Sequence, residues 1–208
     1  MAEGAFSPAV ETPDLTAQLR FLVEADRLKA VLRASRLCDG SRFENSAEHS
    51  WHAALYALTL AGQAGPGVQI DRVIRMLLLH DLVEIDAGDT PIHLDLDPAL
   101  QEAAEQAAAD RLFGLLPAEQ GAEFRALWDE FEAAESADAV FAKSLDRVVP
   151  LLQNLANDGG SWVDYDVRWS QIVTRVGDKV ARGAPDLWTH VAGLVRPWFA
   201  ARGRDDLA

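Results

Sequence analysis

The sequence predicts an all-α fold, a single-domain helical bundle, on three observations. Apolar residues recur at intervals of three and four along most of the chain, as on the buried face of a helix. Helix start and stop signals separate these segments. No segment alternates apolar and polar residues clearly enough to indicate a strand. The 208 residues are enough for one domain with a sizeable core.

The first two helices are marked by signals at their ends. Residues 14–36 follow a Pro-Asp start signal and carry leucines and valines at helical spacing, so they predict a helix. Residues 37–45 are polar and are expected to form a loop. Asn45 and Glu48 resemble a capping box, which starts a second helix over about 46–63 before a stretch rich in glycine.

The third expected helix is the most apolar segment of the chain. Asp71 can cap this helix, and residues 72–83 are apolar nearly all round. That pattern predicts the central buried helix of the bundle. Residues 86–97 contain Asp, Gly and Pro and are expected to form a loop.

The second half of the chain predicts a further series of helices. Asp97 followed by Pro98 is an N-cap with proline at the first helical position. Helices are expected over 98–115, 117–134, 136–156, 166–182 and 186–201, the third with a bend at Pro150. Residues 1–13 are then a flexible N-terminal tail, 14–201 the bundle, and 202–208 a C-terminal tail.

Composition excludes several functional classes. The formal net charge is −14, and so negative a surface repels a phosphate backbone, which disfavours binding of a nucleic-acid polymer. The single cysteine, Cys38, excludes an intrachain disulfide framework and fits a reducing compartment. No apolar run predicts a membrane span, and the N-terminus does not resemble a secretory signal, so a cytoplasmic protein is expected.

The histidines include candidates for metal binding. His80 and Asp81 lie together near the end of the most apolar helix, where an unpaired carboxylate is costly to bury. A cation would offset that cost, and imidazole with carboxylate suits a divalent transition metal. His49 and Asp146 lie in other helices and are candidates for the same site. Alone, the His-Asp dipeptide equally fits a helix end with a hydrogen-bonded core histidine.

The combined pattern resembles the HD-domain phosphohydrolase superfamily, and within it the 5′-deoxynucleotidase-like branch. Three segments carry the resemblance: ENSAEHS at 44–50, HDLVEIDAGDTP at 80–91 and KSLD at 143–146. The likeness covers about residues 15–157. It implies a helical bundle of the HD-domain type with one divalent metal ion, Mn, Co, Fe, Ni or Zn, held by His49, His80, Asp81 and Asp146.

The same resemblance assigns roles to four further residues. Glu84 is the implied acid/base carboxylate, and Asp89 is implied to contact the sugar or assist the attacking water. Arg33 falls where the branch has an arginine that holds the substrate phosphate, a role that suits the guanidinium fork. The branch commonly places a tryptophan soon after that arginine, but Ala34 and Ser35 follow here. Arg36 is therefore an alternative phosphate ligand.

Several other polar residues allow two interpretations each. His52 fits packing or a hydrogen bond to a metal ligand, and His93 fits an exposed loop or a substrate contact. Glu130 and Glu132 resemble an acidic pair of the branch that orients ligands or Arg33, yet a solvated helix face explains them as well. Lys143 is placed either near the phosphate or on the surface.

The sequence therefore predicts a metal-dependent phosphomonoesterase that hydrolyses nucleoside 5′-monophosphates, with deoxyribonucleotides favoured. One alternative is an HD phosphohydrolase acting on another phosphoester or a nucleoside polyphosphate. Another is a non-catalytic module that binds a metal or a nucleotide, which the acidic pair Glu84 and Asp89 argues against. The expected partner is a small nucleotide, and a homodimer is expected only because dimers are the commonest oligomers.

Overall fold

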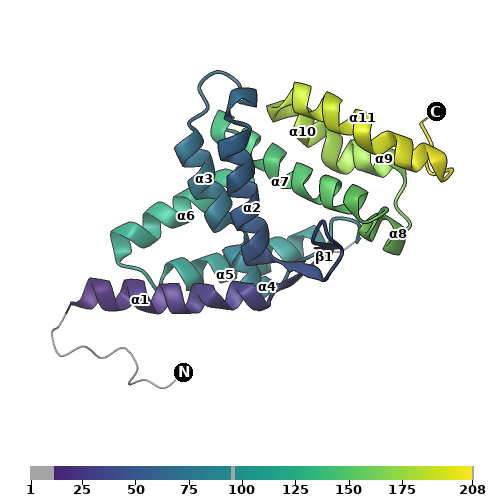
Figure 1. Ribbon diagram of the computed structural model, residues 1–208. Coiled ribbons are helices and arrows are strands. Elements are labelled where there is room, and N and C mark those ends of the chain that lie inside the picture. The colour runs from purple at the N-terminus through teal and green to yellow at the C-terminus, as the bar shows by residue number, and fades with distance from the viewer. Residues whose placement is uncertain (1–11, 95–96, 208) are drawn as a thin grey trace.

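The computed structural model describes residues 12–94 and 97–207, and it confirms the all-α fold (Figure 1). Most of the predicted tail at 1–13 and the last residue of the tail at 202–208 lie outside the described residues. The α-helices are α1 (Pro13–Ala25), α2 (Ser46–Thr59), α3 (Ile70–Leu79), α4 (Glu84–Ala87), α5 (Pro98–Phe113), α6 (Ala118–Ala133), α7 (Ala137–Ala156), α8 (Ser161–Asp164), α9 (Trp169–Ile172), α10 (Asp178–Gly183) and α11 (Pro185–Ala201).

The predicted first helix is wrong beyond its first half. Helix α1 ends at Ala25, a 3₁₀ turn follows over Asp26–Ala30, and the chain then forms strand β1 (Leu32–Arg36). Strand β2 (Phe43–Asn45), in the expected loop, pairs with β1 antiparallel. This hairpin depends on contact between two segments, so helical spacing in one of them did not reveal it.

Strand β1 is irregular at the residue that matters most for the site. Leu32 pairs with Asn45 and Arg36 with Phe43, so three residues of β1 lie opposite one residue of β2. Such a bulge redirects side chains out of the regular alternation of a strand. Arg33 lies within this bulge.

The predicted capping box of α2 is confirmed. The Asn45 side chain accepts a hydrogen bond from the Glu48 backbone N–H at 3.0 Å, and the Glu48 carboxylate accepts one from the Asn45 N–H at 3.2 Å. The cap fixes the start of the helix that carries His49.

Replacing Asn45 with alanine should lower the free energy of unfolding by about 1 kcal/mol, because the helix loses a side-chain cap. Urea denaturation measures the difference. The Asp97→Ala variant, which removes the similar cap of α5, is the matched comparison. An unchanged midpoint for Asn45→Ala would mean that the cap does not hold the first turn of α2.

The central buried helix is α7, and the prediction that residues 72–83 fill this role is wrong. Helix α3 buries one face, but Leu78 on its other side is 48% exposed. Helix α7 contacts α2, α3, α6, α10 and α11 and buries residues along its whole length. Polar side chains are among them, and they include Asp138, Asp146, Gln153 and Asn154. Buried polar groups of this kind need partners. Asp138 accepts a hydrogen bond from the Gln69 backbone N–H and Asn154 donates one to Ser161, whereas Asp146 and Gln153 find their partners in the site described below.

The predicted helix over 166–182 is largely confirmed: a continuous helix runs from Trp169 to Gly183 as α9, a π-helical turn (Val173–Gly177) and α10. This helix packs into a second hydrophobic core, in which Trp162, Trp169 and Phe199 are buried. Gly177 lies against the Trp188 ring, where a side chain would clash. Trp162, Trp169 and Trp198 therefore anchor the last helices of the chain.

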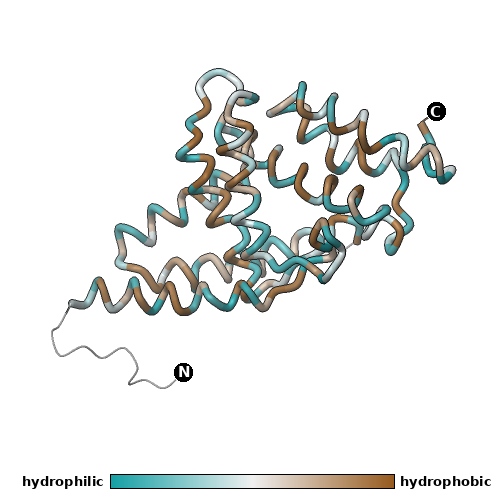
Figure 2. Tube along the Cα trace, viewed as in Figure 1, coloured by the Kyte–Doolittle hydropathy of each residue, from teal (hydrophilic) through white to brown (hydrophobic). Residues whose placement is uncertain are grey.

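Hydrophobic and hydrophilic residues are interspersed along the helices (Figure 2), as expected for amphipathic helices around a core. Within residues 12–94 and 97–207, the structure contains no helix with the length and apolar content to cross a membrane.

Candidate active site

Four side chains from separate parts of the chain meet near the N-terminal end of α2. His49 comes from α2, His80 and Asp81 from the 3₁₀ turn His80–Val83 that follows α3, and Asp146 from α7. Each is at most 9% exposed. His49 Nε2 lies 2.9 Å from Asp146 Oδ1, and His80 Nε2 lies 2.9 Å from Asp81 Oδ1 and 3.6 Å from Asp146 Oδ1.

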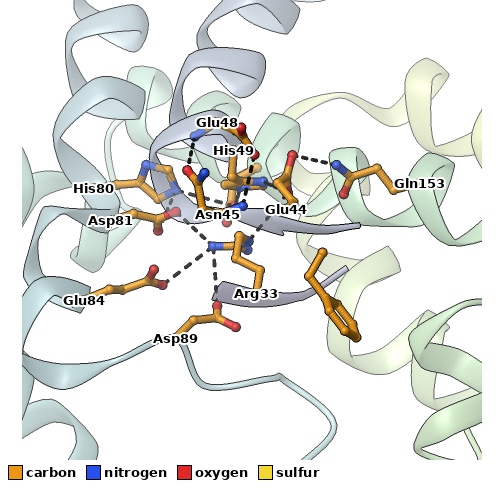
Figure 3. Close-up of polar contacts among 12 residues, drawn as sticks. Arg33, Glu44, Asn45, Glu48, His49, His80, Asp81, Glu84, Asp89 and Gln153 are labelled. Carbon is orange, nitrogen blue, oxygen red and sulfur yellow. Dashed lines mark hydrogen bonds and ion pairs between the residues drawn. The ribbon is translucent and has the colours of Figure 1, made fainter. Parts of the chain in front are cut away.

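The protein fixes how both imidazoles present their nitrogens. His80 Nδ1 lies 2.8 Å from the Leu77 carbonyl oxygen, which only accepts, so Nδ1 carries the proton and Nε2 faces the carboxylates. His49 Nδ1 lies 3.3 Å from the carboxylate of Glu44, and Gln153 donates a hydrogen bond to the other oxygen of Glu44 (Figure 3). Metal-binding histidines are typically oriented by such partners on the opposite nitrogen.

The donor set fits a divalent metal ion. Ligand atoms of His49, His80 and Asp81 lie within 4.8 Å of one another. His80 Nε2 is buried and makes no hydrogen bond of good geometry, although carboxylate oxygens surround it. Two imidazoles with carboxylates are ordinary ligands of Mn, Fe, Co, Ni and Zn ions.

The electrostatics of the cluster also favour the binding of a cation. Burial alone would lower the pKa of His80, but the carboxylates of Asp81 and Asp146 raise it to about 10. Burial would raise the pKa of Asp81, yet His80 and Arg33 lower it to about 2. The carboxylates therefore draw protons onto the imidazoles, at the nitrogens where a metal ion would compete for the same lone pairs.

Arg33 connects the acidic residues of the site. Its Nη1 lies 2.9 Å from Asp81 Oδ2, 3.4 Å from Asp89 Oδ1 and 3.6 Å from Glu84 Oε1, and its Nε lies 3.8 Å from Glu44 Oε2 (Figure 3). Burial opposes the charge of this guanidinium, but the neighbouring carboxylates outweigh burial and raise the pKa of Arg33. Arg33 thus neutralises several buried carboxylates at once.

Glu84 and Asp89 lie beside the four-residue cluster and not within it. Glu84 opens α4, and Asp89 follows Gly88, whose φ of 77° is readily adopted only by glycine. Burial, with the Asp81 carboxylate, raises the pKa of Glu84 to about 9, and burial also raises the pKa of Asp89. The Oε2 atom of Glu84 is buried without a hydrogen-bond partner. Both carboxylates therefore take up a proton more readily than an exposed carboxylate does.

The structure does not bring Arg36 to this cluster. Its guanidinium stacks on the ring of Phe43 at 4.2 Å, at the paired end of β1. The bulge redirects Arg33 inward and leaves Arg36 in regular pairing with the outer strand. Of the two arginines that the sequence offered, only Arg33 lies against the acidic residues.

A pocket opens beside the cluster. Its lining includes Arg33, Asp81, Glu84, Asp89 and Asp146. The lining also includes Lys143, Arg147, His93, Trp162, Ile172 and Val176. We call this the active-site pocket. It combines charged groups with an apolar wall, as sites for small polar molecules do.

The structure also shows where the polar residues that allowed two interpretations lie. Lys143 and His93 both line the pocket. Glu132 pairs with Lys143 at 2.9 Å, whereas Glu130 pairs with Arg72 and so does not orient Arg33. His52 packs against Trp51 and Tyr56.

Three residues of the site were missed by the sequence analysis. Glu44 and Gln153 support His49, and Arg147 lines the pocket with its Nε 3.6 Å from Asp146 Oδ2. Glu44 opens one of the three segments that carry the family resemblance, and Arg147 directly follows another. Their positions were therefore visible, but their contacts depend on the fold.

Comparison with known proteins shows which family the chain belongs to. A family model described as HD domain matches residues 25–188. The human protein named 5′-deoxynucleotidase HDDC2 is 29% identical over 136 residues, which cover 65% of this chain and 65% of that protein, just under two thirds of its length. The Bos taurus protein of the same name is 29% identical over 153 residues, covering 71% of this chain and 73% of that protein.

A solved structure is more similar still. It is described as a predicted metal-dependent phosphohydrolase from Magnetospirillum magnetotacticum MS-1, with a TM-score of 0.85 and 48% sequence identity, covering 92% of this chain and 98% of that chain. A second, from Pyrococcus furiosus, has a TM-score of 0.58 at 18% identity and supports the fold alone.

Proposed function

The chain belongs to the HD-domain family and is a hydrolase, and from this premise we propose that it is a metal-dependent phosphomonoesterase. Its proposed substrates are nucleoside 5′-monophosphates, with deoxyribonucleotides favoured. The observation that carries this proposal is the convergence of His49, His80, Asp81 and Asp146 beside a pocket that also holds carboxylates outside the ligand set, Glu84 and Asp89 among them.

The four converging residues would hold one divalent ion. When bound, such an ion supplies Lewis acidity at a phosphoryl oxygen and makes water a better nucleophile at neutral pH. Arg33 lines the pocket beside these residues and supplies positive charge for the phosphate that is hydrolysed. Leu77 and Glu44 hold the two imidazoles in one orientation, so the ligands need little rearrangement.

We assign proton transfer to Glu84 and Asp89. Glu84 is proposed to accept a proton from the attacking water, and Asp89 to assist the water or contact the sugar. Glu84 keeps a proton at neutral pH in the cluster as described, because its pKa is about 9. With a divalent ion held by the neighbouring ligands, the pKa of Glu84 would fall toward the range of a general base.

The nucleotide assignment rests on the relatives and on the shape of the pocket. Curated relatives are named 5′-deoxynucleotidases. The apolar side chains of Trp162, Ile172 and Val176 also line the pocket, and we propose that they contact a sugar or base. No tryptophan follows Arg33, so selection of deoxyribose would need other residues of this pocket.

Chelation should abolish phosphate release, and Mn²⁺ or Co²⁺ should restore it. The purified protein is assayed with deoxyribonucleoside and ribonucleoside 5′-monophosphates, with nucleoside di- and triphosphates as comparison. Metal content is measured in parallel by mass spectrometry. We expect the deoxyribonucleoside monophosphates to be hydrolysed fastest.

Three outcomes of this assay contradict the proposal. Turnover that survives complete removal of metal would overturn the metal-dependent chemistry. Exclusive hydrolysis of di- or triphosphates would replace the monoesterase with another HD phosphohydrolase activity. A metal-loaded protein that is silent on every compound would favour a binding module.

A further inference from the structure

A second hollow adjoins the active-site pocket, between α5, α6, α7 and α10. We call it the side pocket. Four basic residues line it, two from α7 and two from α10, and we call them the cationic wall: Lys143, Arg147, Lys179 and Arg182. Lys143 and Arg147 also line the active-site pocket, so the cationic wall runs continuously from one hollow to the other.

Close packing of two helices brings these four cations together. Gly183 of α10 lies so near α7 that an added Cβ would approach the Val140 carbonyl oxygen to 2.6 Å. The Ser144 hydroxyl donates to the Val140 carbonyl and lies 3.3 Å from the Lys179 carbonyl oxygen. Spacings of four on α7 and three on α10 place each basic pair on one helix face.

The charge of the cationic wall is only partly offset by ion pairs with acidic side chains of the described residues. Among the described residues, neither Lys179 nor Arg182 forms an ion pair, although the chain as a whole carries an excess of acids. Lys143 pairs with Glu132, and Arg147 lies beside Asp146. The charges of Arg147 and Lys143, together with burial, lower the pKa of Lys179. Like charges held this closely favour a bound anion.

The opposite side of the side pocket limits which anion fits. Its acidic residues come from α5 and α6, and they are Glu102, Glu105, Asp129 and Glu132. A long polyanion would meet these carboxylates, whereas one compact phosphate can contact the cationic wall alone. Lysine and arginine are the side chains that phosphate groups most often contact.

We propose that the cationic wall is a second phosphate subsite, which holds a phosphate group other than the one hydrolysed. The phosphate has two conceivable sources with the same chemistry. It is either a second phosphate carried by the substrate or free inorganic phosphate leaving the active-site pocket. Its assignment to the substrate rests on the proposed function, whereas phosphate binding by the wall does not.

The first test measures binding of inorganic phosphate by calorimetry to the full, metal-loaded protein. The Lys179→Gln/Arg182→Gln variant removes two cations that lie outside the active-site pocket. Losing two charge-assisted contacts should weaken one class of phosphate site by about tenfold or more. The Arg20→Gln/Lys29→Gln variant removes the same charge from exposed positions far along the chain and should bind as the unmodified protein does. Equal binding by both variants overturns the proposal.

The second test separates the two sources. If the substrate carries the phosphate, the Lys179→Gln/Arg182→Gln variant raises KM for a nucleoside 3′,5′-bisphosphate or 5′-diphosphate and leaves KM for the 5′-monophosphate unchanged. If free phosphate is the ligand, the variant instead weakens product inhibition by phosphate. A variant that changes neither quantity contradicts the subsite. Should no nucleotide be hydrolysed at all, the proposed function fails, while the calorimetric test still decides the subsite.

Discussion

Replacing Glu84 with glutamine should lower kcat by about 10²–10⁴-fold, the usual contribution of a positioned general acid or base. Glutamine has nearly the same shape but cannot accept a proton from water. Glu84 lies beside the four converging residues without being one of them, since its closest charged partner is Arg33 at 3.6 Å. Metal content should therefore stay close to that of the unmodified protein while turnover falls.

Asp86 provides the matched control for this experiment. It is an acid of the same short helix, but its carboxylate is half-exposed and pairs with Arg111 outside the pocket. The Asp86→Asn variant should keep its kcat within a few-fold of the unmodified protein. If Glu84→Gln loses its metal, Glu84 is a ligand and not the acid/base residue. If Glu84→Gln keeps full kcat, Asp89 becomes the better candidate for proton transfer.

The helical architecture was largely predictable because local signals decide where most helices begin. Asn45 and Glu48 form the capping box that their spacing indicates, and Asp97 caps α5 as expected. The β1–β2 hairpin was not predictable, because each strand is stabilised by the other and neither shows a strand pattern by itself. Helix α7 became the centre of the fold because other helices surround it, which its own sequence does not encode.

The site was predictable as a set of residue types at characteristic spacings, and the structure brings those residues into contact. Two features lay beyond the sequence. The bulge in β1 directs Arg33 inward and leaves Arg36 stacked on Phe43. The sequence of a five-residue strand does not reveal a bulge. The cationic wall depends on how closely Gly183 lets α10 approach α7, which only coordinates reveal.

Replacing Arg33 with methionine should lower the free energy of unfolding of the metal-free protein by about 3–5 kcal/mol. Methionine fills similar volume but leaves Asp81, Glu84 and Asp89 without the cation that contacts all three. Buried carboxylates that lose their partner are far more costly than an exposed ion pair. Urea denaturation with chelator present measures the loss. Adding Mn²⁺ should recover part of it, because a cation at the ligands would again offset the charge of Asp81.

Two companion variants separate the charge of Arg33 from its packing. Arg33→Lys keeps one positive charge but not the guanidinium fork. Its free energy of unfolding should therefore lie between that of the unmodified protein and that of Arg33→Met. Arg36→Met removes an arginine three residues away that stacks on Phe43. It should lower the free energy of unfolding by less than about 1 kcal/mol. Equal losses for Arg33→Met and Arg36→Met would show that Arg33 does not neutralise the acidic cluster. In that case the bulge in β1 would have no electrostatic role, and other groups such as His80 would compensate the carboxylates of the metal-free protein.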